Sequence, residues 1–272
     1  MINNLDIQSY GYFTENGFKN NFNYYLKNTI SAGKNNTEYD SSPHVKLMNI
    51  FELVSSYPLI STSESYSNYL DPKISLRVNP SDMKSYKNEN RQINNDNLFN
   101  INRLGLIDTL ESGNNLTLGL DFKRENINNI NKYFELKLGK VLRTKTNSNL
   151  PSNSTLDKKN SNYFGKIVNT LNDNINLNYE FSINHDLDEI QYSSLSTTIK
   201  KNNFVTTFKY IEEEGEVGSA NILENVSTFN FNNHNYITFK TRENKEINLT
   251  EYYDLIYEYK NDCLVAGIKY NK

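Results

Sequence analysis

The feature that most constrains this chain is an alternation of apolar and polar residues that recurs along most of its length. In "NLTLGLDF" (115–122) every second residue is apolar, and "NINLNYEFSINH" (174–185) repeats the pattern over a longer stretch. Side chains of a β-strand point to opposite faces in turn, so this period of two predicts strands with one apolar and one polar face.

About fifteen such segments can be counted, most of them about 8 to 13 residues long, whereas an average globular strand has about five or six. The apolar spacing of an amphipathic helix is not sustained anywhere. The sequence therefore predicts an all-β fold, and the length of the strands suggests that they cross something.

The connections in the second half alternate in character. Short polar turns are predicted at 171–174, 200–203, 232–235 and 260–262, and longer charged loops at 185–189, 212–219 and 241–248. In an antiparallel up-and-down meander, successive connections fall at opposite ends of the strands. Short turns at one end and longer loops at the other are typical of an outer-membrane β-barrel.

The first half contains three long polar connections, at 33–43, 80–96 and 144–162. The strand pattern suggests three crossings between the second and the third of them. That count would place these two connections at opposite ends, unless one strand has been counted wrongly.

Several functional classes are disfavoured by composition and motif. The formal charge of −3 gives no general attraction for nucleic acid, and no apolar run is long enough for a transmembrane helix. His44, His185 and His234 lack metal-ligand spacing, and no nucleophile, phosphate-binding or dinucleotide-binding motif is present. We therefore expect no enzyme activity, no metal and no cofactor. The acidic run 212–216 is expected to be a solvated loop.

The single cysteine, Cys263, follows the turn "KND" at the predicted short-turn end. The surrounding stretch "NLTEYYDLIYEYKNDCLVAGIKY" (248–270) resembles the C-terminal barrel region of the LPS-assembly outer membrane protein LptD family, of the alphaproteobacterial type. Residues 57–84 and 101–125 resemble earlier barrel segments of that family.

This resemblance implies a partial transmembrane β-barrel in the outer membrane of a Gram-negative bacterium. It also implies passage of lipopolysaccharide to the outer leaflet, an LptE-like plug lipoprotein in the lumen, and an LptA-like periplasmic bridge that joins through a jellyroll. Residues 1–272 would be one barrel region of a longer chain. Its signal peptide, jellyroll and first strands would precede Met1, and its closing strands would follow Lys272.

The resemblance also implies a role for Cys263, which matches a barrel-side cysteine that forms a disulfide with the jellyroll. Many relatives carry two adjacent cysteines there, whereas Leu264 follows here, so at most one such bridge can form. The partner cysteine lies outside this chain.

Two other functions remain open from the residues alone. One is a general porin or receptor barrel, and the other is a soluble β-rich structural or adhesive protein, which the mean hydropathy of −0.72 mildly favours. The polar faces, such as Asn176, Asn178, Glu180 and Ser182, are candidate lumen positions only as a group.

Overall fold

The computed structural model describes residues 1–34 and 41–272 and confirms the all-β prediction. Part of the expected loop 33–43 lies outside the described residues. One sheet contains sixteen strands, and all pairs are antiparallel. Its strands are β1 (Ile2–Gln8), β2 (Tyr12–Phe13), β3 (Lys19–Ser31), β4 (His44–Ser56), β5 (Leu59–Thr62), β6 (Tyr66–Asn79), β7 (Gly113–Asn126), β8 (Tyr133–Arg143), β9 (Asn160–Asn172), β10 (Ile175–Ile183), β11 (Ile190–Lys201), β12 (Phe204–Glu213), β13 (Ala220–Asn230), β14 (Asn235–Asn244), β15 (Leu249–Lys260) and β16 (Val265–Asn271).

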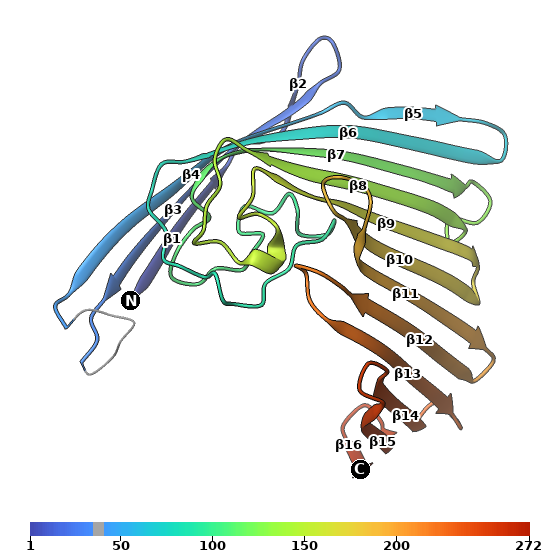
Figure 1. The fold of residues 1–272 in the computed structure, drawn as a ribbon. Coiled ribbons are helices and arrows are strands. Elements are labelled where there is room, and N and C mark those ends of the chain that lie inside the picture. Colours follow the sequence, from blue (N-terminus) through green and yellow to red (C-terminus); the bar gives the residue numbers. More distant parts are fainter. Residues whose placement is uncertain (35–40) are drawn as a thin grey trace.

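The strands follow one another across the sheet in chain order, which is the predicted up-and-down meander. The two short strands lie off this path, because β2 pairs with β3 and β5 pairs with β6. Figure 1 shows that the sheet curls around a concave side, with β1 and β16 at its two edges. Within the described residues these edges do not pair, so the sheet is an open part of a barrel wall.

Asparagine side chains form the short turns. Asn172 Oδ1 accepts hydrogen bonds from the backbone amides of Asn174 and Ile175, between β9 and β10. Asn232 and Asn261 accept in the same way in the two later turns. Asparagine folds back on its own backbone and also tolerates a left-handed conformation, which Asn202 adopts with a φ of 50°. These turns therefore need little glycine.

The connections fall at two ends, as the turn pattern predicted. The short turns of the second half share one end, which we call the short-turn end, and the loops 184–189 and 214–219 lie at the other. The third loop expected at that end, 241–248, is only 245–248, because β14 continues to Asn244. The expectation of three crossings between the second and third long connections is wrong, because only β7 and β8 lie between them. Residues 80–112 contain no strand, so both long connections emerge at the long-connection end.

The two faces of the sheet differ in polarity. Lys27, Glu52 and Arg77 alternate with outward residues and point to the concave side, where their side chains are buried. On the outward face, large apolar side chains are exposed, among them Leu76 at 49% and Phe208 at 48%. An exposed apolar surface that extends over a whole sheet indicates contact with lipid or a partner.

Within residues 1–34 and 41–272, helical structure is limited to one turn of 3-10 helix, η1 (Ser152–Ser154). No helix in the described ranges has the length and apolar character needed to cross a membrane.

Candidate functional site

Two long connections fold back into the concave side of the sheet, where Figure 1 shows them as the teal and yellow-green segments. We call residues 80–112 and 144–159 together the insert. Its apolar side chains form a core with two residues of the sheet. The buried members are Met83, Tyr86, Ile93, Leu98, Leu104, Leu106, Leu150 and Leu156 of the insert, with Val141 and Phe164 of the sheet. The insert is thus packed against the sheet as a folded body.

Two glycines let the insert approach the sheet closely. Gly119 of β7 and Gly139 of β8 are paired across the ladder. A Cβ at position 119 would lie 2.6 Å from the ring of Phe99, and one at 139 would clash with Leu98, which is fully buried. Because neither position has a side chain, Phe99 and Leu98 of the insert can pack directly on the backbone of the sheet.

Glu111 of the insert is the centre of a buried network of charges. Its carboxylate accepts from Arg103 Nε at 2.7 Å and from Arg143 at the end of β8. Arg77 of β6 lies 3.6 Å away, and Asn115 Nδ2 donates at 3.2 Å. Burial opposes the ionised form of Glu111, but the three guanidinium groups outweigh it and lower the pKa of Glu111 to about 2.

A second carboxylate joins this network from the sheet. Glu52 of β4 accepts from Arg77 at 2.7 Å and from Ser75 at 2.8 Å, and its side chain is only 1% exposed. Arg77 also donates to the backbone carbonyl of Asn100 at 3.0 Å. Two carboxylates thus share the central arginine, which ties the sheet to the insert.

Lys27 of β3 fixes another part of the insert. Its Nζ donates to the backbone carbonyls of Leu106, Ile107 and Thr109 at 3.0, 2.7 and 3.3 Å. The side chain is 2% exposed. A buried ammonium needs hydrogen-bond partners, and these carbonyls supply them.

A tyrosine–aspartate contact lies within the insert itself. Tyr86 donates its hydroxyl to Asp108. Burial and the neighbouring carboxylate raise the pKa of Tyr86 to about 12, so it remains a donor at every physiological pH.

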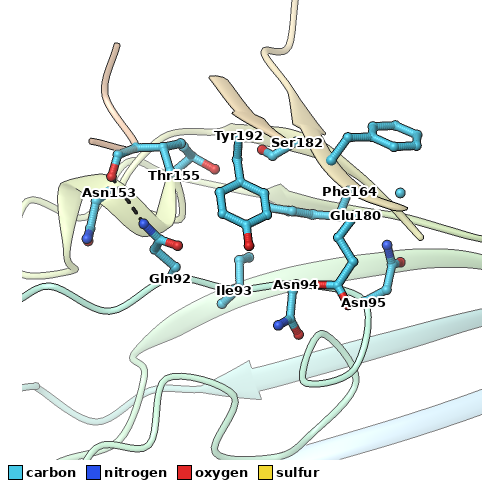
Figure 2. Close-up of a pocket in the computed structure, with 13 residues that line it drawn as sticks. Gln92, Ile93, Asn94, Asn95, Asn153, Thr155, Phe164, Glu180, Ser182 and Tyr192 are labelled. Atoms are coloured by element: carbon cyan, nitrogen blue, oxygen red, sulfur yellow. Dashed lines mark hydrogen bonds between the residues drawn. The ribbon is translucent and has the colours of Figure 1, made fainter. Parts of the chain in front are cut away.

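Between the insert and β9–β11 lies a small cavity of ≈ 50 Å³. Figure 2 shows Tyr192 and Glu180 of the sheet extending toward Ile93 and Asn94 of the insert. Gln92 closes one side by donating to the Val217 carbonyl at 3.3 Å. A space of this size holds water and not a lipid chain.

The polar strand residues expected to line a lumen do point to the concave side, but they differ in surroundings. Glu180 and Ser182 line the small cavity beneath the insert. Asn176 donates to Thr170 at 2.7 Å within the sheet. They do not form one site, and in Figure 1 the insert lies away from the concave side of β13–β16.

The three histidines are far apart in the structure. His44 begins β4, His185 lies in the loop after β10, and His234 lies in the turn before β14, where its Nδ1 is 3.0 Å from the Lys260 carbonyl. In the described ranges no group of side chains is suited to hold a metal ion.

Cys263 lies in the turn between β15 and β16, at the short-turn end, and its thiol is exposed. The Asn261 side chain accepts from its backbone amide at 3.0 Å. The position agrees with the end that the turn pattern predicted, while its pairing stays a prediction.

The insert and its charge network were not anticipated from the sequence. The sequence places Lys27, Glu52 and Arg77 at inward positions of strands. A pattern of this kind is equally typical of a polar face in contact with water. Arg103 and Glu111 lie in an irregular segment with no periodicity, so nothing local indicated that they would meet.

Comparison with known proteins gives one family. The model of a family described as LPS transport system D (LptD) matches residues 5–255. A search among curated proteins found no match.

We predict that Glu111→Gln opens the insert. The substitution leaves Arg103 and Arg143 buried without a full counter-charge, which costs about 3 kcal/mol or more. The backbone amides of residues 98–106 should exchange faster with solvent deuterium, and the free energy of local opening calculated from their exchange should fall by this amount. Glu89→Gln is the matched control: its carboxylate pairs with Arg91 but is 49% exposed, so the expected cost is below about 1 kcal/mol. Equal protection in the two variants would contradict the role of the network.

The network also predicts a dependence on acid. The pKa of Glu111 is lowered from 4.5 to about 2 in the folded protein, so its stabilisation is complete above pH 4.5 and is lost as the pH falls toward about 2. Pepsin should cut the insert increasingly over that range. Glu111→Gln is the control, since without the carboxylate its cleavage should lose this pH dependence. The same acid profile in both proteins would assign the opening to other groups.

Proposed function

Because the chain belongs to the LPS transport system D (LptD) family, which transports and assembles lipopolysaccharide at the outer membrane, we propose that it is part of the translocon that inserts lipopolysaccharide into the outer leaflet. The observation that carries this proposal is the family match over residues 5–255. The apolar outward face and polar concave face are those of a membrane-embedded barrel wall. The family transports its substrate, so we propose movement of lipopolysaccharide without bond chemistry.

The orientation in the membrane follows from the two ends of the sheet. Barrels of the outer membrane have short periplasmic turns and longer extracellular loops. We therefore place the short-turn end, with Cys263, in the periplasm, and the long-connection end outside. The insert then enters the barrel from the extracellular end.

The proposed route for lipopolysaccharide is the concave side of β13–β16 and of the part of β12 near the short-turn end. The insert fills the space against β3–β9, and its Gln92 donates to Glu213 at the long-connection end of β12 and to the Val217 carbonyl just after it. Beyond it, two pairs of inward charges join neighbouring strands: Arg242 contacts Glu224, and Lys269 lies 2.9 Å from Asp254. Cations that are paired within the protein retain an anionic headgroup less strongly.

Several partners follow as further proposals from the family. An LptE-like plug lipoprotein would occupy part of the concave space beside the lipopolysaccharide route, and an LptA-like bridge would deliver lipopolysaccharide through a periplasmic jellyroll. Residues 1–272 would then be one barrel region of a longer chain, and the open edges β1 and β16 would pair with further strands. The exposed edges support this proposal, because unpaired strand edges promote aggregation.

Cys263 is proposed to form a disulfide with a cysteine of that jellyroll. Its exposed thiol at the short-turn end supports the proposal, because a bridge to a periplasmic domain needs an accessible sulfur in the oxidising periplasm.

The proposed route predicts where lipopolysaccharide is captured in transit. Val205 points to the concave side near the short-turn end, and its neighbour Phe204 points outward at the same depth. A photo-crosslinking residue at 205 should capture lipopolysaccharide in cells. The same residue at 204 faces the inner leaflet, so it should capture much less. Equal capture at both positions, or a chain that is monodisperse in buffer without detergent, would contradict the proposal.

The proposed disulfide predicts a change in gel mobility. The full-length parent and its Cys263→Ser variant should migrate differently on a non-reducing gel, because the closed loop compacts the denatured chain. Reducing agent should abolish the difference and serves as the control. Identical migration before reduction would exclude this bridge.

A further inference from the structure

A shallow apolar groove of ≈ 470 Å³ crosses the outward face of β7, β8 and β9. Its side chains are Leu118 and Leu120 of β7, Leu138 and Leu142 of β8, and Tyr163 of β9. They face outward because they alternate with residues that contact the insert, such as Gly119, Gly139 and Val141. One charged residue, Lys140, also lines this groove.

Lys140 is placed against an aromatic ring and not against a carboxylate. Its Nζ lies 3.7 Å from the centre of the Tyr163 ring, which is its cross-strand partner on β9. A cation over an aromatic face is stabilised, but the positive charge remains uncompensated. Within the part of the chain that the structure describes, Lys140 has no ion pair.

The other lysines of β6–β9 have different partners. All of them point to the concave side and each has a carboxylate: Lys73 with Asp121 at 2.6 Å, Lys123 with Glu125 at 2.6 Å, Lys137 with Glu135 at 2.7 Å, and Lys166 with Glu180 at 3.1 Å. The sheet therefore compensates every inward lysine of β6–β9 and leaves the outward one for an external anion.

The depth of Lys140 indicates which anion it meets. It lies three residues before Arg143, the last residue of β8, and so about 10 Å along the strand from the long-connection end. With its flexible stem the ammonium reaches the headgroup level, while Leu120 and Leu138, which are paired two residues farther from the long-connection end, remain at the depth of acyl chains. A charge held in the apolar band without a partner is costly, and this cost favours an anionic occupant.

We propose that this groove binds a phosphate-bearing lipid of the outer leaflet, with its phosphate on Lys140 and an acyl chain along Leu120 and Leu138. The inference rests on the proposed orientation in the outer membrane. Free phosphate is a poor occupant, because a single ammonium provides one contact and the apolar walls contribute only when they cover hydrocarbon.

The test compares lipid retention by the full-length parent and by its variants at position 140 in nanodiscs. The discs contain phosphatidylcholine with a minor fraction of diphosphorylated lipid A, and native mass spectrometry counts the lipid A that stays bound after release. Lys140→Gln should lower lipid A occupancy about fivefold, the effect of one cation near a membrane surface. Lys140→Arg should retain it, because a guanidinium also pairs with phosphate.

Two controls separate the possible explanations. Lys137→Gln removes an inward lysine of the same strand and should leave retention unchanged, whereas lipid A without its phosphates should be retained equally by wild type and Lys140→Gln. Equal occupancy in wild type and Lys140→Gln, or loss of retention when inorganic phosphate displaces the lipid, would overturn the proposal. If instead the full-length parent never enters the disc, the proposed membrane function itself fails.

Discussion

Continuous antiparallel pairing from β1 to β16 is the constraint on which the rest of this structure depends. Once each strand is paired in register with the next, every side chain is assigned to one of two faces, and a shift by one residue would exchange them. Leucine and phenylalanine are thereby collected on the outward face, and Glu52, Arg77 and Lys27 on the concave face. The groups that hold the insert and the groups that meet lipid are consequences of the same alternation.

The concave face could have remained hydrated, but near β3–β9 it is covered by the insert. Covering it removes water from charged strand residues, and each one must then find a partner. The partners come from the insert: the Glu111 carboxylate for Arg77 and Arg143, and backbone carbonyls for Lys27. Because removing one partner leaves a buried charge unpaired, these contacts fix the insert in one position more than they add to its stability. The apolar core around Leu98 provides the burial.

The sequence was sufficient for the elements whose signal is local. Alternation located the long strands, and asparagine-rich turns located the end at which Cys263 lies. It was insufficient for residues 80–112, where Leu98, Leu104 and Leu106 are buried against the concave face of the sheet and follow neither the helical nor the strand period. Because these residues are apolar, the sequence predicted one strand more than the structure contains in this part of the chain. Arg103 and Glu111 meet because of tertiary folding, and Glu111 reaches Arg143 across 32 positions of the chain.

The two faces also differ in how charge is compensated, and this difference connects the structure to its surroundings. On the concave side of β6–β9, each lysine has a carboxylate partner within the protein. On the outward side near the long-connection end, Lys140 has an aromatic neighbour and no carboxylate. An isolated cation is tolerated there only if the environment supplies the anion. In the proposed orientation that environment is the outer leaflet, whose phosphorylated lipids supply the anion that the protein does not provide for Lys140.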